Sequence, residues 1–381
     1  NGEDSQLAHV HKSYEISKKE NAVAVVVWDG THNPIGRAKV LYDILINNDR
    51  PSIIFALDFG EFGQGLWGPI RDSSIEVVLI PWRDREFYFQ YILSLEINFS
   101  TVWICKPRKP SFELASIISN EKTKFILDID DDESVMSASG PSSVRHYGKV
   151  GYQYFEPMIN QFNSLSVASI ALKQRFGGEI VRHARKYDLT KSKTAERYVA
   201  GSINIGFIGT VRPHKNLAAA ARSINILSKF GRQKLQLVVG GHYYPAEVRN
   251  ELEELGVLTL GQINQTSLSS CLLKLDIILV GFPNKFDDEI AKYQISSKIG
   301  DALAVGKPVM VPYSESVKDL EGERGIYLFD MHNFSDVLTK VLKDISKRFQ
   351  NFTLPKDFTL SGAYNVFARL EAKALPGQLF D

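Results

Sequence analysis

The chain has 381 residues, which is long for a single domain, so two domains are expected. Its residues are 44% hydrophobic and 23% charged, a composition typical of a globular protein with a packed core. The formal net charge of +1 argues against a dedicated nucleic-acid-binding protein, which normally carries a strongly basic face.

Cys105 and Cys271 lie in apolar runs without metal-ligand spacing, so we expect buried, reduced thiols and a cytoplasmic location. No apolar run reaches the length of about 18 residues that a transmembrane helix needs. Residues 1–20 are too polar for a signal peptide.

Short, nearly continuous apolar runs in the first half predict strands buried on both faces of a parallel sheet. These runs lie at 22–30, 52–59, 75–81, 101–107 and 124–130. Helical periodicity follows several of them, at 37–48, 86–96 and 111–119. The same alternation returns in the second half, with strands predicted at 203–209, 235–241, 257–261, 276–282 and 307–313 and helices at 216–230, 245–255, 265–275 and 296–305.

This pattern predicts an α/β protein made of two Rossmann-like, doubly wound domains that face each other across a cleft. The N-terminal domain would span 1–195, and the C-terminal domain 203–350. The polar, aperiodic stretch 186–202 is expected to link them. An apolar helical stripe near the C-terminus predicts a helix at about 360–381 that crosses back to the first domain.

Three strand ends in the second domain carry candidate ligands, because parallel sheets bind ligands at the carboxyl ends of their strands. After Gly209, the turn before a helix holds Arg212 and Lys215, which would bind an anion together with the free N–H groups of the helix. The alternative is that both are solvated loop charges. Gly241, in a glycine pair after the next strand, would let the backbone approach a ligand, although a plain tight turn is the simpler interpretation.

The third strand end precedes the segment SSKIGDALAV, 296–305. Ser296 or Ser297 can cap its helix, and Lys298 and Asp301 share one helix face at a spacing of three residues. Asp301 would accept ribose hydroxyls while Lys298 meets a phosphate. Taken alone, a simple ion pair between the two side chains explains the pattern better.

In this order and spacing, 206–217, 276–282 and 296–312 resemble the nucleotide-sugar half of GT-B glycosyltransferases, specifically the retaining family 4. The resemblance covers about 203–330. It implies that Lys215 binds the diphosphate and that Asp301, one methylene shorter than the usual glutamate, binds ribose. Two positions depart from the family: Tyr293 stands where many members have a first glutamate, and Thr210 follows the glycine where an arginine is usual.

In the first domain, the run 128–133 places five acids at a strand end, which is costly unless something cationic or hydroxylated binds there. Asp128, Asp130 and Asp132 could hold Mg²⁺ or Mn²⁺, but the resemblance implies an enzyme without a metal cofactor. The other interpretations are hydrogen bonds to sugar hydroxyls and helix capping. We favour a mixture, with Asp130 and Asp131 facing the cleft.

The turn THNPIGR, 31–37, follows the first strand and, by the resemblance, approaches donor and acceptor. Gly36 would allow close backbone approach, and Arg37 or His32 would supply a hydrogen-bond donor on the acceptor side. His146 is a further candidate, although a lone histidine is more often structural.

These features and the resemblance together predict a hexosyltransferase that moves sugar from a nucleotide-diphosphate sugar to a hydroxyl acceptor, with no nucleic-acid partner. The resemblance further implies retention of configuration, a glycan or lipid-linked acceptor and a role in glycan or polysaccharide biosynthesis. Catalysis would rest on Lys215, Lys298, Arg212 and Asp130. The alternatives are a nucleotide-sugar epimerase on the same fold and an inactive nucleotide- or sugar-binding module.

Basic islands at 106–110 and 182–193, with aromatic residues at 82–95, suit peripheral contact with the anionic inner face of a membrane. The alternative, slightly favoured, is that the aromatic residues lie in the core and the charges are solvated.

Overall fold

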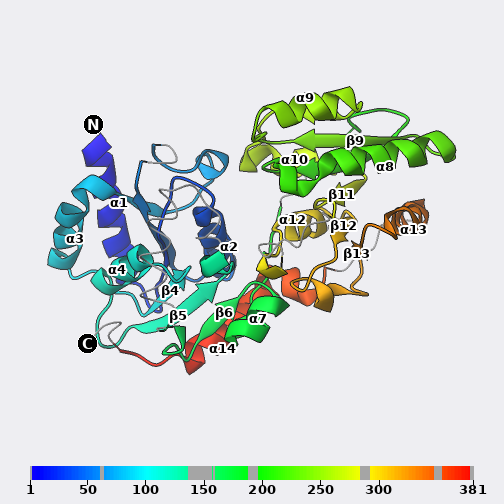
Figure 1. The fold of residues 1–381 in the computed structure, drawn as a ribbon. Helices are drawn as coiled ribbons and strands as arrows, with labels where there is room; N and C mark the ends of the chain where they lie inside the picture. Colours follow the sequence, from blue (N-terminus) through cyan, green and yellow to red (C-terminus); the bar gives the residue numbers. More distant parts are fainter. Residues whose placement is uncertain are drawn as a thin grey trace. The chain divides into compact units, whose positions relative to one another are not determined.

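The structure is a computed structural model that describes residues 2–60, 64–135, 157, 159–187, 196–283, 292–346 and 354–377. The chain forms two compact units, coloured along the sequence in Figure 1. The first unit combines Asn1–Ala184, Glu289–Ile295 and Thr359–Asp381, and the second combines Arg185–Asp288 and Ser296–Phe358. The chain therefore leaves the first unit after Ala184, returns to it briefly, and ends in it.

The described part of the first unit has a seven-stranded sheet whose neighbouring strands are all parallel. Its strands are β1 (Val23–Val27), β2 (Ser52–Asp58), β3 (Val77–Pro81), β4 (Thr101–Cys105), β5 (Lys124–Ile129), β6 (Leu165–Val167) and β7 (Glu179–Ile180). They are arranged in the order β3-β2-β1-β4-β5-β6-β7. All five residues of β1 are buried, as expected for a strand covered on both faces.

The helices of this unit are α1 (Gly2–Ser17), α2 (Pro34–Ile46), α3 (Arg85–Ser94), α4 (Lys109–Ile117), α7 (Ile170–Phe176) and α14 (Leu360–Lys373). Helices α1 and α3 lie on one side of the sheet and α2 on the other (Figure 1). The C-terminal helix α14 begins where Thr359 Oγ1 accepts a hydrogen bond from the N–H of Gly362 at 2.9 Å. Its Phe367 ring lies 4.9 Å from that of Trp103, so α14 completes the core of the first unit.

The second unit has a six-stranded parallel sheet in its described part, made of β8 (Ile203–Ile208), β9 (Leu235–Gly240), β10 (Leu258–Leu260), β11 (Ile277–Leu279), β12 (Val309–Pro312) and β13 (Ile326–Phe329). Their order is β10-β9-β8-β11-β12-β13. Its helices are α8 (Leu217–Phe230), α9 (Glu247–Glu254), α10 (Gln265–Leu273), α12 (Lys298–Ala304) and α13 (Phe334–Ser346). In α8, Leu217, Ala220 and Ile224 form the buried stripe that fastens it to the sheet.

The strand order reverses between β1 and β4 in the first sheet and between β8 and β11 in the second. In doubly wound sheets, the crevice at such a reversal, beyond the carboxyl ends of the strands, is where ligands bind. The expected α/β architecture of two Rossmann-like units is thus confirmed, and it singles out the segments that follow these four strands.

Several elements were not expected from the sequence: α1, the group β6, α7 and β7, and the final pair β13 and α13. Helix α1 buries only Val10, Ser13 and Ile16 among its described side chains, too narrow an apolar face to signal a packed helix. Within the described residues, no helix is long and apolar enough to cross a bilayer.

Candidate active site

The turns after β8 and β9 run side by side at the carboxyl edge of the second sheet. The N–H of Gly209 donates to the carbonyl of Gly240, and that of Val211 to the carbonyl of His242, each at 2.8 Å. Gly209 and Gly241 have φ values of 146° and 136°, which favour glycine, and a Cβ on Gly241 would overlap the Gly209 carbonyl oxygen. These glycines let the two backbones close together at the ligand-binding edge.

Lys298, the first residue of α12, brings an ammonium group to this edge. Its Nζ lies 2.8 Å from the place where a Cβ on Gly209 would be, and 4.7 Å from the centre of the Phe207 ring. Burial, and then the neighbouring charge of Lys215, lowers the pKa of Lys298 to about 8, while Asp301 acts in the opposite direction. Within the described residues, no hydrogen bond or ion pair holds this ammonium. The half-buried cation is therefore placed to receive an anion.

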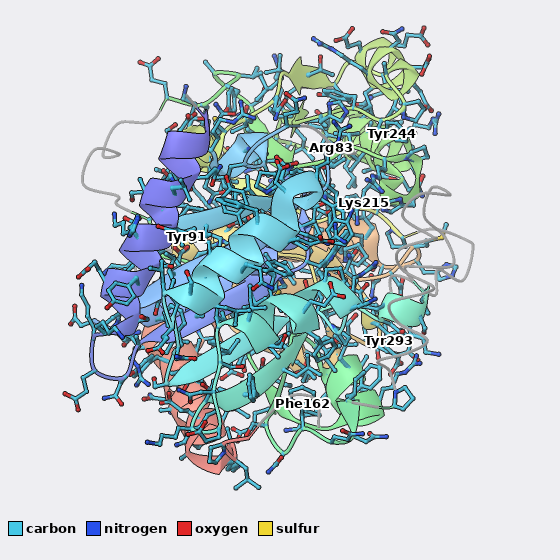
Figure 2. All side chains as sticks on the ribbon, turned by 90° about the vertical axis from the view of Figure 1, so that its left-hand side faces the viewer. Arg83, Tyr91, Phe162, Lys215, Tyr244 and Tyr293 are labelled. Carbon is cyan, nitrogen blue, oxygen red and sulfur yellow. The ribbon has the colours of Figure 1, made fainter. Side chains whose placement is uncertain are left out.

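Lys215 (Figure 2) ends the 3₁₀ turn η3 (Pro213–Lys215), close to the point where the strand order reverses. Its carbonyl accepts a hydrogen bond from the N–H of Phe282 at 3.0 Å, and Asn216 Nδ2 donates to the carbonyl of Pro283 at 2.7 Å. Asn216 has a left-handed φ of 48°, a conformation that asparagine tolerates better than most residues. The turn after β8 is thus fixed to the segment after β11, which places Lys215 near Lys298.

Arg212 and Ser297 were also expected in the donor site. Arg212 is exposed, with its guanidinium 6.0 Å from the ring of Tyr244. Ser297 is the N-cap residue of α12, and it accepts the N–H of Asp301 through its carbonyl, without a capping hydrogen bond from its side chain. The hydroxyl of the preceding Ser296 accepts the N–H of Lys298 at 3.3 Å.

Asp301 is held by two residues that the sequence analysis did not identify as site residues. Arg185 Nε donates to Asp301 Oδ1 at 3.1 Å, and the Tyr187 hydroxyl donates to the same oxygen at 2.7 Å. Gln265 Nε2 donates in turn to the Tyr187 hydroxyl at 3.3 Å. Burial and the Asp301 charge together raise the pKa of Tyr187 well above its ordinary value, so the phenol stays a donor. Among the described residues, the ion pair of Asp301 is with Arg185 and not with Lys298, contrary to the alternative of a simple pair between Lys298 and Asp301.

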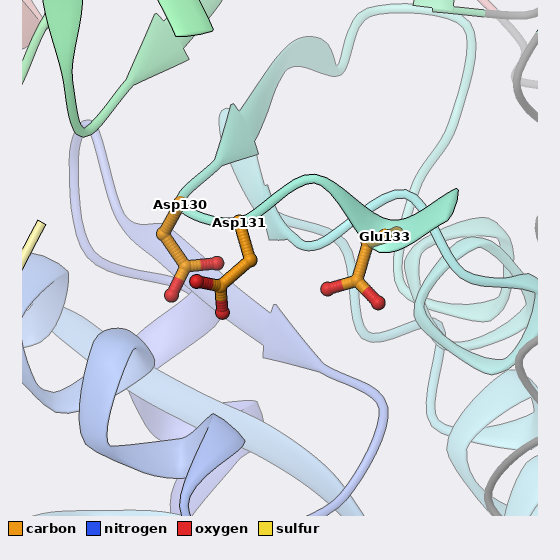
Figure 3. Close-up of side chains that lie close together, drawn as sticks. All are labelled: Asp130, Asp131 and Glu133. Carbon is orange, nitrogen blue, oxygen red and sulfur yellow. The ribbon is translucent and has the colours of Figure 1, made fainter. Parts of the chain in front are cut away.

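In the first unit, the acids after β5 form a compact carboxylate cluster (Figure 3). Oxygen atoms of Asp130, Asp131 and Glu133 lie within 4.8 Å of one another, close enough to share a metal ion. The ammonium of Lys106 takes that place: its Nζ lies 2.8 Å from Asp130, 2.7 Å from Asp131 and 3.2 Å from Glu133. Arg108 also pairs with Glu133.

The carboxylates of this cluster are not equivalent. Burial raises the pKa of Asp130 to about 7; Lys106 opposes the shift, and the charges of Asp131 and Asp128 add to it. Burial acts on Asp131 in the same direction, but Lys106 and a hydrogen bond from Gln294 outweigh it and lower its pKa. Burial thus favours the neutral form of Asp130, whereas Lys106 and Gln294 favour the charged form of Asp131.

The turn after β1 is only partly arranged as expected. His32 Nδ1 lies 3.2 Å from Asp29, and the His32 ring stands edge-on to that of Trp28 at 5.1 Å. Gly36 lies in the first turn of α2. The expected acceptor-side role of Arg37 does not fit its surroundings, because its buried guanidinium binds both oxygens of Asp128, at 2.9 and 2.8 Å.

Solved structures share this architecture along almost their whole length. A mutant of TarM from S. aureus, in complex with Fondaparinux, alpha-GlcNAc-glycerol and UDP, has 11% identity and a TM-score of 0.58 over 92% of this chain and all (100%) of that one. AviGT4, a glycosyltransferase involved in avilamycin A biosynthesis, has 14% identity and a TM-score of 0.57, covering 93% and 98%. WaaG, a glycosyltransferase involved in lipopolysaccharide biosynthesis, has 15% identity and a TM-score of 0.53, covering 94% and 97%.

The chain has the GT-B fold. No protein-family model and no curated protein matches its sequence. At identities of 15% or less, the likeness identifies the GT-B architecture, and the chemistry has to be inferred from the residues of this chain.

Tyr293 stands at the position where the sequence resemblance expects a first glutamate. Tyr293 belongs to the short piece of chain that returns to the first unit. Its carbonyl accepts the Ser169 hydroxyl at 2.9 Å, and its ring lies 5.3 Å from the Arg175 guanidinium (Figure 2). A tyrosine here fastens the returning segment within its own unit.

In the described part of the chain, the basic islands expected at the surface are partly internal, although Lys109 and Lys186 are exposed. Lys106 and Arg108 are buried in the carboxylate cluster, and Arg182 is buried with its guanidinium donating to the carbonyl of Ala168 at 3.1 Å. Arg185 is engaged with Asp301. Cys271 is half-buried, in contrast to the buried Cys105. His146, 188–195 and the acids 287–289 lie outside the described residues.

Proposed function

We propose that the protein is a glycosyltransferase that moves a hexosyl group from a nucleoside-diphosphate sugar to a hydroxyl acceptor, with retention of configuration. The observation that carries the proposal is the half-buried ammonium of Lys298, close to Lys215 at the glycine-lined edge of the second GT-B unit. Two cations at one strand edge suit a diphosphate, which gains negative charge as it leaves the sugar.

The roles in the donor site follow from this placement. Lys298 and Lys215 would bind the diphosphate, with Arg212 at the outer edge. Gly209 and Gly241 would let it approach the backbone, next to Ser297. Asp301 would accept ribose hydroxyls through the oxygen that Arg185 and Tyr187 leave available.

On the acceptor side, Asp130, Asp131 and His32 would bind the sugar hydroxyls. The reaction would need no metal cofactor, because the cations of the protein supply the positive charge. We place the enzyme in the cytoplasm, in glycan or polysaccharide biosynthesis, with a glycan or lipid-linked acceptor and peripheral contact with an anionic membrane face. The structural neighbours include a glycosyltransferase involved in lipopolysaccharide biosynthesis and one solved in complex with alpha-GlcNAc-glycerol.

The test is to incubate the protein with a panel of nucleotide sugars and to follow nucleotide release with and without hydroxyl acceptors. A transferase releases nucleoside diphosphate faster when an acceptor is present, and NMR of the product reports retention or inversion. Release or epimerisation without an acceptor would indicate an epimerase. Binding without any turnover would indicate the inactive module.

A further inference from the structure

The C-terminal end of α8 presents large apolar side chains to solvent. Phe230 is 81% exposed, the highest value among the exposed large hydrophobic residues described, and Ile226 is 59% exposed. They are four residues apart and therefore share one helix face, on the side opposite the buried Ile224. The GT-B core does not explain why these two residues are apolar.

This end of the helix is also strongly basic. Between 197 and 246 the sequence has no Asp or Glu, but it has seven Lys or Arg residues: Arg197, Arg212, Lys215, Arg222, Lys229, Arg232 and Lys234. Arg212 and Lys215 lie at the donor edge, Arg197 pairs with Asp276, and Arg222 pairs with Glu251. The remaining three, Lys229, Arg232 and Lys234, are exposed around Phe230. We call Ile226, Lys229, Phe230, Arg232 and Lys234 the α8 tip.

The donor site does not account for the α8 tip. Helix α8 has 14 residues, so at about 1.5 Å per residue its two ends are roughly 20 Å apart. On the adjoining α9, Glu251 and Glu253 are engaged by Arg222 and Arg249, which leaves Glu247 and Glu254. Even when both are counted against Lys229, Arg232 and Lys234, the balance is three minus two, or one positive charge.

We propose that the α8 tip docks on an anionic lipid membrane. An exposed phenylalanine with an aliphatic neighbour can insert between lipid head groups, while the surrounding cations bind the acidic phosphates. A nucleic acid would also bind the cations, so single-stranded DNA is included as a competitor in the test below. The inference rests on the membrane contact proposed above and moves it to the α8 tip, because Lys106, Arg108 and Arg182 of the basic islands are buried. It does not require transferase activity.

The test is co-sedimentation with vesicles of 70% phosphatidylcholine and 30% phosphatidylglycerol, compared with pure phosphatidylcholine. The protein should bind the anionic vesicles at low salt and dissociate at 0.5 M NaCl. The triple variant Lys229→Gln, Arg232→Gln, Lys234→Gln should bind at least tenfold more weakly, and Phe230→Ser at least threefold. In Phe230→Trp, the added fluorescence should shift to the blue on binding, because the indole enters an apolar layer.

Two matched controls make the result specific. Lys18→Gln, Lys122→Gln, Lys173→Gln removes three exposed cations of the first unit, and Phe87→Ser removes an exposed phenylalanine of α3. Both should bind as the original protein does. Vesicle binding that is lost in Phe87→Ser but kept in Phe230→Ser would overturn the proposal, as would tighter binding to single-stranded DNA than to the vesicles. Nucleoside-diphosphate affinity measured on the same samples reports the donor site separately, so either proposal can fail alone.

Discussion

Arg185 and Asp301 form an ion pair with 3.1 Å between Nε and Oδ1, although 116 residues separate them in the sequence. Arg185 is the first residue of the second unit after the chain crosses from Ala184. The same crossing segment supplies Tyr187, so the carboxylate expected to bind ribose is oriented by residues next to the connection between units.

Arg185→Ala should lower the free energy of unfolding by about 1–3 kcal/mol, because it removes a hydrogen-bonded partner from the buried Asp301 carboxylate. Urea denaturation measures the change. Arg222→Ala is the matched control: it breaks an ion pair of two exposed residues and should change stability by less than about 1 kcal/mol. Equal effects from the two substitutions would mean that Asp301 does not depend on Arg185.

Lys298→Ala and Asp301→Ala should each weaken nucleoside-diphosphate binding at least tenfold, on the order of 1.4 kcal/mol, without unfolding the protein. Calorimetry measures the affinities. Lys307→Ala serves as the control, since Lys307 is also a half-buried lysine whose pKa is lowered by burial, but its charged neighbours are Asp276 and Arg197. If Lys298→Ala and Asp301→Ala both bound nucleoside diphosphate as tightly as the original protein does, the donor-site assignment would be wrong.

The affinity for a nucleoside diphosphate should fall as the pH rises through about 8, because Lys298 then loses its charge. Lys298→Arg should abolish this decline, since arginine stays protonated. The stability of the unliganded protein should move the other way. The lowered pKa means that the unfolded chain binds more protons between pH 8 and 10.5, so this lysine favours folding increasingly as pH rises over that range. A pH-independent affinity would contradict the assignment.

Asp130→Asn should stabilise the protein at pH 8, by on the order of 1 kcal/mol. The folded-state pKa of about 7 lies above the ordinary 3.8, so the folded protein binds the extra proton and loses stability as pH rises between these values. The amide removes that loss, and Lys106 keeps Asp131 and Glu133 as partners. Thermal melts of both proteins at pH 5 and pH 8 measure this gain in stability. A gain at pH 5 as large as the gain at pH 8 would show that it does not come from the raised pKa of Asp130.

Sugar transfer should survive EDTA, because Lys106 already lies between the carboxylates that could bind a metal. The measurement is nucleotide release before and after chelation. If EDTA abolished activity and Mg²⁺ or Mn²⁺ restored it, the acids at 128–133 would have to be reassigned as metal ligands.

Much of the fold could be predicted from the sequence, because strands buried in a parallel sheet correspond to short, continuous apolar runs in the sequence. The run at 22–30, for example, contains β1, in which every residue is buried. Helix α1 could not be predicted in this way, since its packing depends on a few side chains such as Val10 and Ile16.

Part of the donor edge could be predicted from the sequence, because Gly209, Lys215 and Lys298 each stand at a recognisable strand end or helix start. The hydrogen-bond and ion-pair partners of the charged groups could not be predicted. Arg37 and Asp128 are 91 residues apart, and Arg185 was counted among surface charges. Charge pairing between distant strands depends on the register and order of the sheet, and a single sequence does not state either.

The ammonium of Lys106 reaches its three carboxylates from a backbone φ of 69°, in the left-handed region that non-glycine residues rarely adopt. A metal ion at the same place would exchange with the medium, and its occupancy would follow the cellular supply. An ammonium tied to the main chain is always present at the same effective concentration, and no chelator can withdraw it. The carboxylate cluster therefore receives a permanent positive charge from a side chain of its own unit.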